Sequence, residues 1–177
     1  MRLAYRGANF HGWQTQPNDV SVQETLEQAM TMVMRTPIKI TGAGRTDAEV
    51  NAAMMVAHFD AEPIADPVRL VHQLNSVLCK DTAVYSIFPV HDDAHARFDA
   101  TSRTYFVDTA KNPFHYPLSW KCPPDLDFEL MNEAAEHLME YIDFTSFSKL
   151  HTDVKTNNCR ITHARWQQEG SQGVFTI

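Results

Sequence analysis

The sequence has 177 residues, which is enough for one ordinary domain or for one domain and part of a second. Hydrophobic residues make up 44% of it, so the chain can bury a core and is not compositionally disordered. The formal net charge of −7 argues against a protein with a generally basic surface for nucleic acid, although it allows a local basic groove.

The cysteines and the apolar stretches indicate the compartment. Cys79, Cys122 and Cys159 are odd in number, lie far apart and form no C-x-x-C pair, so neither a disulfide framework nor a zinc knuckle is expected. The first residues have no signal-peptide pattern, and no stretch approaches the roughly 18 apolar residues of a membrane helix. We therefore expect a soluble, cytoplasmic protein.

The first half of the chain alternates patterns typical of strands and of amphipathic helices. Ser21 to Glu24 has the form of a capping box that begins a helix, and Asp66-Pro67 is typical of a second helix start. Strands are predicted at residues 2–5, 39–41, 55–59 and 82–88. The order strand, helix, strand, strand, helix, strand is that of a ferredoxin-like unit, an antiparallel sheet with helices on one face.

Apolar residues at helical spacing mark the faces of these two helices that should pack on the core. The methionines among them are expected to be core residues rather than a cofactor surface. In the first helix the face consists of Val22, Leu26, Ala29, Met30, Val33 and Met34, and in the second of Val68, Val71, Leu74 and Leu78.

The second half of the chain repeats part of this order. The expected elements are a strand at residues 103–109, a helix at 128–142 and strands at 160–166 and 173–177. Four prolines make residues 112–124 a loop. The last strand would need a crossover helix and a partner strand that do not follow it. We therefore expect two α+β domains, residues 1–92 and residues 93–177, the second of them incomplete.

Residues 42–52 contain the main candidate for chemistry. Gly42 and Gly44 allow a tight turn and a close approach of the backbone to another group. Arg45, two residues before Asp47, would favour the ionised carboxylate and hold its orientation, and an ionised aspartate can act as a nucleophile. The G-x-x-x-x-G-K-[ST] pattern of a phosphate-binding loop is absent. Local chemistry alone favours the alternative, an ordinary loop with an Arg–Asp surface pair.

Residues 95–105 combine arginines with an aromatic side chain. Arg97 and Arg103 could bind phosphates, and Tyr105 could stack on a base. Arg103 and Tyr105 would lie on the same face of the predicted strand. A half-exposed strand with ordinary surface arginines explains the same residues equally well.

Two other clusters have a structural explanation that we favour. The aromatic residues of segment 9–16 could contact a base or close the core, and for Trp13 the core is favoured. Residues 91–95 place four possible metal ligands within five positions. No distant Cys or His pattern completes a site there, so no metal is expected.

Taken in order, these segments resemble the motifs of the tRNA pseudouridine synthase A family. Residues 5–14 resemble Y-D-G-T-x-F-x-G-W-Q, and residues 43–52 resemble the active-site motif A-G-R-T-D-A-G-V-H-A. The other matches are V-Q-x-x-L-E at residues 22–27, H-A-R-F-x-A-x-x-R-x-Y at 95–105 and D-F-x-x-F at 143–147. Five ordered motifs over almost the whole chain are far more specific than any one of them.

The resemblance implies isomerisation of uridine to pseudouridine in the anticodon stem-loop of tRNA, by a homodimer that needs no metal or other cofactor. Asp47 matches the family's nucleophile, and Tyr105 matches the active-site tyrosine that packs on the base. Arg45 matches the arginine that pairs with the aspartate and helps to displace the base, at an unstacking cost of a few kcal/mol. The residues expected to bind RNA are Arg97, Arg103, His95, His11 and Gln14.

The sequence departs from the family pattern at several positions. Arg6 stands where the family has Asp, and Glu49 and Asn51 stand where the active-site motif has Gly and His. A positive φ at position 49 would strain the loop, and Glu49 adds a negative charge near Asp47. The family continues after the strand matching residues 173–177 with an F-L-x-x-M-V-R helix. These departures leave two alternatives, a catalytically impaired or truncated tRNA-binding relic and a dimerising scaffold without an RNA role.

Overall fold

The computed structural model describes residues 1–101, 104, 126–148, 156–170 and 172–177. The chain divides into two compact units, Met1–Thr101 and Ser102–Ile177. The division differs from the expected boundary after residue 92, because residues 94–99 attach to the first unit. There the backbone N–H of Ala96 donates to Nδ1 of His58 (3.0 Å). No helix in the described ranges is both long and apolar enough to cross a lipid bilayer.

The first unit contains a four-stranded antiparallel sheet and two α-helices, in the element order that the sequence predicts. Its elements are β1 (Arg2–Tyr5), a 3₁₀ turn (Gly7–Asn9), α1 (Val22–Met34), β2 (Thr41–Gly42), β3 (Ala52–His58), α2 (Pro67–Val77) and β4 (Thr82–Ser86). The strands lie in the order β2-β3-β1-β4, and each neighbouring pair is antiparallel. β1 is therefore a central strand that pairs with both β3 and β4.

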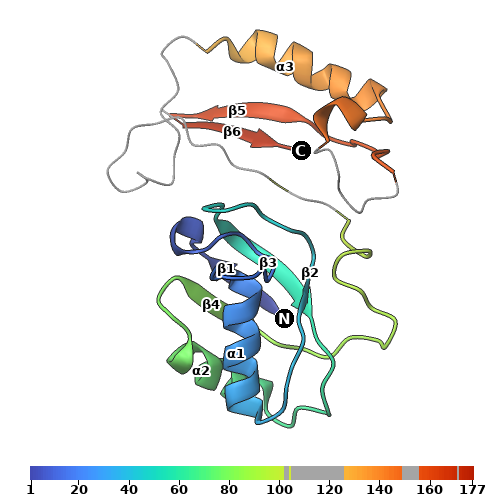
Figure 1. Cartoon of the computed structure of the whole chain (residues 1–177). Helices are drawn as coiled ribbons and strands as arrows, with labels where there is room; N and C mark the ends of the chain where they lie inside the picture. The colour runs from blue at the N-terminus through green and yellow to red at the C-terminus, as the bar shows by residue number, and fades with distance from the viewer. Residues whose placement is uncertain (102–103, 105–125, 149–155, 171) are drawn as a thin grey trace. The chain divides into compact units, whose positions relative to one another are not determined.

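Side-chain caps begin both helices where the sequence predicts them. The Ser21 hydroxyl accepts the backbone N–H of Glu24 (3.2 Å) at the start of α1. The Asp66 carboxylate accepts the N–H of Arg69 (2.9 Å) at the start of α2, with proline in the first turn. Figure 1 shows α1 and α2 on the same side of the sheet.

The core lies between the sheet and the two helices, and the predicted face of α1 is confirmed. Val22, Leu26 and Met30 are fully buried, together with Leu3 of β1. The predicted face of α2 is partly wrong: Val68 is 69% exposed, and Leu70 is buried in its place. Leu70 and Leu74 lie one turn apart toward the core, whereas a residue two positions from Leu70 is rotated away by roughly 200°.

The second unit contains a helix and a β-hairpin. Its elements are α3 (Phe128–His137), two 3₁₀ turns (Leu138–Glu140 and Thr145–Phe147), β5 (Arg165–Glu169) and β6 (Gln172–Thr176). Asn132 of α3 is hydrogen-bonded to both backbone groups of Trp166 in β5 (2.8 and 3.0 Å). β5 begins later than the predicted strand at residues 160–166, because hairpin pairing starts with Arg165 opposite Thr176. The strand and loop predicted at residues 103–109 and 112–124 lie outside the described residues, apart from Thr104.

Candidate active site

Residues 43–51, which we call the Asp47 loop, connect β2 to β3. The side chains of Arg45 and Asp47 are exposed, whereas Thr46 between them is half-buried. The Thr46 hydroxyl is hydrogen-bonded to the hydroxyl of Tyr5, a buried residue of β1 (2.8 Å). The loop therefore presents Arg45 and Asp47 to the surface on either side of an anchored residue.

A second segment, residues 6–14, packs along the Asp47 loop, and we call it the N-terminal loop. The backbone N–H of Trp13 donates to the carbonyl of Thr46 (3.0 Å), and the N–H of Glu49 donates to the carbonyl of Phe10 (3.2 Å). These two bonds hold the backbone just before and just after Asp47. The position of Asp47 is thus set by residues more than thirty positions earlier in the chain.

Two glycines allow the loops to approach this closely. A Cβ atom on Gly7 would lie 2.3 Å from the carbonyl oxygen of Val50. A Cβ atom on Gly12, whose φ is +90°, would lie 2.5 Å from the carbonyl oxygen of Thr46. The N–H of Gly7 also donates to Oδ1 of Asn51 (2.9 Å), which gives the residue in place of the family's histidine a structural contact.

Trp13 is a core residue, as the sequence favours, and its ring packs against the end of β2, where the Asp47 loop begins. Its side chain is only 3% exposed, and its ring centroid lies 6.0 Å from that of Tyr5. A Cβ atom on Gly42 would lie 2.5 Å from the Trp13 ring. The indole therefore fills the space that a side chain at the end of β2 would need.

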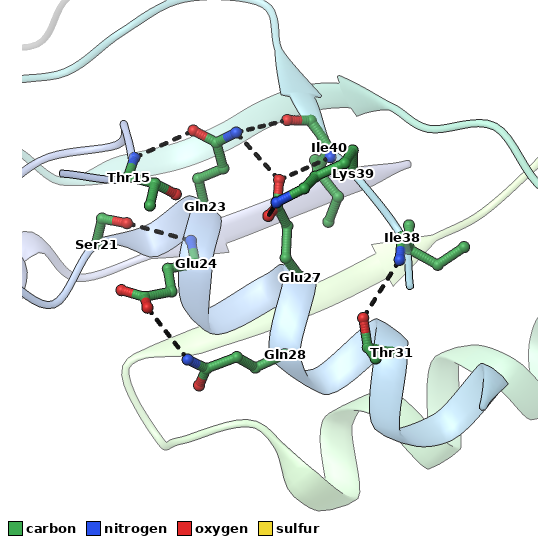
Figure 2. Close-up of polar contacts among 10 residues, drawn as sticks. All are labelled: Thr15, Ser21, Gln23, Glu24, Glu27, Gln28, Thr31, Ile38, Lys39 and Ile40. Carbon is green, nitrogen blue, oxygen red and sulfur yellow. Dashed lines mark hydrogen bonds and ion pairs between the residues drawn. The ribbon is translucent and has the colours of Figure 1, made fainter. Parts of the chain in front are cut away.

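Side chains of α1 form hydrogen bonds with the backbone just before β2, as Figure 2 shows. The buried carboxylate of Glu27 accepts the backbone N–H of Ile40 (3.0 Å), and Gln23 donates to the carbonyl oxygen of Ile40 (2.9 Å). Gln23 also donates to Glu27 (3.1 Å), and its own oxygen accepts the N–H of Thr15 (3.2 Å). Both backbone groups of Ile40 are thus satisfied by a helix, so β2 begins later than the predicted strand at residues 39–41.

The charge environment of Glu27 favours its ionised form. Burial alone would raise the pKa of Glu27, but hydrogen bonds from Lys39, Ile40 and Gln23 together lower the pKa below its ordinary value. The ammonium group of Lys39 lies 2.8 Å from Oε2 of Glu27, on a side chain that is 88% exposed. In the sequence, Gln23 and Glu27 stand out only as part of the V-Q-x-x-L-E match, and the sequence does not predict their contact with Ile40.

The structure does not contain the predicted ion pair between Arg45 and Asp47. Both residues are described and exposed, and no salt bridge joins them. The backbone contacts of the Asp47 loop, rather than a guanidinium, therefore hold the aspartate in place. The guanidinium of Arg45 does not contact the carboxylate that the sequence assigned to it.

Arg6 has a partner that explains its departure from the family pattern. Its side chain lies 3.8 Å from Oδ1 of Asp81, a buried residue just before β4. The N–H of Arg6 donates to the Asp81 carbonyl (2.8 Å), and Nδ2 of Asn9 donates to Oδ2 of Asp81 (2.5 Å). A carboxylate at position 6 would face Asp81 with like charge, so an arginine suits this chain.

Glu49 adopts the left-handed backbone conformation that the glycine of the family motif would accept without cost. Its φ is +67°. A Cβ atom in this region lies close to the backbone, which costs roughly 1–2 kcal/mol in L-residues other than Gly, Asn and Asp. The expected strain at position 49 is therefore present beside Asp47.

Replacing Glu49 with glycine should relieve this strain. We expect the free energy of unfolding to rise by about 0.5–1 kcal/mol, since the gain in φ freedom exceeds the entropy cost of glycine. Urea denaturation followed by fluorescence would measure the change. Glu49→Ala is the control, because it removes the charge but keeps Cβ. A glycine variant no more stable than the alanine variant would contradict the prediction.

The expected RNA-binding residues fall in two places in the first unit. His11 and Gln14 are exposed residues of the N-terminal loop, which packs against the Asp47 loop. His95 is half-buried, and its Nδ1 accepts the N–H of Arg97 (3.2 Å). This segment attaches at His58, at the other end of β3 from the Asp47 loop, a strand length of roughly 20 Å.

Two of the expected site residues, Arg103 and Tyr105, lie outside the described residues. The part of the chain that the structure describes contains no group of three or more His, Cys, Asp or Glu residues arranged to hold a metal ion. Of the expected site residues, Arg45 and Asp47 lie on the Asp47 loop and His11 and Gln14 on the N-terminal loop, and all four are exposed.

Comparison with known proteins gives the chain its family. No family model matches it. It is 62% identical over 178 residues to a tRNA pseudouridine synthase A of Parabacteroides distasonis, covering 99% of this chain and 71% of that protein. The protein of the same name from Bacteroides thetaiotaomicron is 55% identical over 180 residues, with 99% and 67% covered. The one from Aquifex aeolicus is 31% identical over 160 residues, with 88% and 66% covered.

Identity at this level over nearly the whole chain defines a class of protein, the isomerases that modify RNA. The chain belongs to the tRNA pseudouridine synthase A family. The resemblance of the ordered motifs is thereby confirmed.

Proposed function

We propose that this protein isomerises uridine to pseudouridine in the anticodon stem-loop of tRNA, with Asp47 as the nucleophile. The observation that carries the proposal is the exposed carboxylate of Asp47 on a loop whose backbone is bound on both sides of it. Relatives named tRNA pseudouridine synthase A support it. A preorganised, exposed carboxylate is the group that covalent catalysis on a displaced nucleotide requires.

In the proposed reaction, the Asp47 carboxylate attacks the flipped-out uridine at ribose C1′ or at base C6. The bond from C1′ to N1 breaks, the base rotates, and a bond from C1′ to C5 forms. The bond between Asp47 and the nucleotide then breaks, which regenerates the free carboxylate. The hydrogen at C5 leaves to solvent and N1 gains a proton, so the product is an isomer of uridine. Arg45 displaces the target base, and Tyr105 packs on it and assists removal of the proton.

The RNA is held by Arg97, Arg103, His95, His11 and Gln14 in this proposal. The strand order β2-β3-β1-β4 supports a ferredoxin-like first domain. In this proposal a second α+β domain of the pseudouridine synthase fold follows it. The enzyme acts as a homodimer without a metal or other cofactor. Three dispersed cysteines are consistent with the cytoplasm as its compartment.

Tritium release from tRNA tests the proposal. Incubating the purified protein with tRNA that carries 5-tritiated uridine should release tritium to solvent, because C5 loses its hydrogen in the reaction. An anticodon stem-loop RNA should be a substrate, whereas an RNA of the acceptor and T arms should not. Tritium release no greater than that of a protein-free control would overturn the proposed enzymatic activity.

Salt dependence of tRNA binding separates the alternatives. We expect the dissociation constant to rise at least about tenfold between 50 and 200 mM salt, because phosphate contacts release counterions. Salt-dependent binding without tritium release would indicate the non-catalytic relic, an alternative that the strained Glu49 beside Asp47 favours. Absence of tRNA binding would leave only the alternative of a dimerising scaffold without an RNA role.

A further inference from the structure

The hydrogen bond between Tyr5 and Thr46 joins the centre of the sheet to the residue before Asp47. Tyr5 lies in β1, and its side chain is 4% exposed. Its hydroxyl lies 2.8 Å from Oγ1 of Thr46, 41 positions further along the chain. Thr46 is the hydrogen-bond partner of this hydroxyl among the residues that the structure describes.

Thr46 is held at two atoms, and one of them belongs to the peptide group that precedes Asp47. Its side chain is bonded to Tyr5, and its carbonyl oxygen accepts the N–H of Trp13 (3.0 Å). The carbonyl of Asp47 accepts the N–H of Val50 (3.4 Å) on the other side. The peptide groups on both sides of the Asp47 Cα atom are therefore fixed, and with them the direction of its Cα–Cβ bond.

We propose that Tyr5 and Thr46 are positioning residues that aim the Asp47 carboxylate at the target uridine. This inference rests on the proposed function, because it assumes that Asp47 reacts. Since Arg45 forms no ion pair with Asp47, the backbone must supply the orientation. A reacting group displaced by 1 Å loses on the order of a hundredfold in rate, so one bond next to the nucleophile matters.

The hydroxyl of Tyr5 is suited to a fixed neutral contact. Burial raises the pKa of Tyr5, and the hydrogen bond with Thr46 offsets part of this rise. The phenol therefore stays protonated at neutral pH and can donate to Thr46 or accept from it. Its ring also packs near Trp13, so the phenylalanine variant keeps the packing and loses only the hydroxyl.

The test compares Tyr5→Phe and Thr46→Val with the unaltered protein. We expect kcat for tritium release to fall by roughly 10- to 100-fold in each variant, while tRNA affinity changes less than about threefold. The double variant should be no slower than either single variant, because both remove the same bond. Thr46→Ser keeps the hydroxyl and should restore most of kcat. Tyr85→Phe is the control, since Tyr85 is an exposed tyrosine of β4.

Hydrogen exchange in the free protein supplies a readout that does not depend on activity. The backbone amides of Trp13 and Val50 should exchange about tenfold faster in Tyr5→Phe, because their acceptors lie in the Thr46 to Asp47 segment. Unchanged exchange would overturn the inference whether or not the protein is active. Unchanged kcat in Tyr5→Phe, with no release by an Asp47→Asn variant, would overturn the inference but leave the proposed function standing.

Discussion

Replacing Asp47 with asparagine should abolish tritium release from labelled tRNA, a loss of at least about a thousandfold. The amide has nearly the same shape as the carboxylate but is not a nucleophile. Because the side chain of Asp47 is exposed and contacts no ion-pair partner in the described structure, the free energy of unfolding should change by less than about 0.5 kcal/mol. Single-turnover tritium release and urea denaturation measure the two quantities.

Glu49→Gln is the matched control for this variant. It removes the same charge from an exposed position two residues away in the same loop. We expect it to keep the activity of the unaltered protein within a fewfold. Equal losses in both variants would mean that the net charge of the loop matters and that Asp47 is not the nucleophile.

Replacing Glu27 with alanine should be the most destabilising of the changes considered. The variant leaves the N–H of Ile40 without its acceptor and removes the partner of Gln23 inside the unit. A buried group that loses its partner costs about 1–3 kcal/mol, so we expect a total loss of about 2–4 kcal/mol in the free energy of unfolding. Urea denaturation at neutral pH would measure it.

The pH dependence of this loss follows from the lowered pKa of Glu27. The stabilisation by ionised Glu27 is complete above the pKa of an unfolded glutamate, about 4.3. It is lost as the pH falls below that value and through the lower pKa of the folded chain. The unaltered protein and Glu27→Gln should therefore converge in stability at acid pH. A stability difference that grows on acidification would contradict the assignment.

Lys39→Met is the control for the Glu27 variant. The ammonium group is almost fully exposed, so the ion pair is screened by solvent. We expect the methionine variant to lose far less stability than Glu27→Ala. A comparable loss would show that the ion pair, rather than the contacts with Ile40 and Gln23, stabilises this part of the unit.

The fold of the first unit was predictable where its signals are local. The caps at Ser21 and Asp66 and the stripe of α1 involve neighbours within one or two turns, and the structure has them. The start of β2 was not predictable, because the bonds of Ile40 go to side chains of a distant helix. The face of α2 was ambiguous as well, since its apolar residues fit more than one helical stripe and only the sheet selects Leu70.

The candidate site was predictable only from the order of its motifs. The local chemistry around Asp47 favoured an ordinary loop, and the expected pair with Arg45 is absent from the described structure. The contact of Tyr5 with Thr46 joins residues 41 positions apart, and no local pattern reports it. The strain at Glu49 could be anticipated, because the family motif has glycine at this position. The structure has it, since the φ of Glu49 is +67°.

The close packing of the two loops at Gly7 and Gly12 has a consequence for folding and for which substitutions the loops accept. The Asp47 loop needs β1 and the N-terminal loop in place to adopt its final conformation, because the two loops pack against each other and share backbone hydrogen bonds. Formation of the candidate site therefore depends on long-range contacts rather than on a local turn. A side chain at Gly7 or at Gly12 is tolerated only together with a compensating shift in the Asp47 loop.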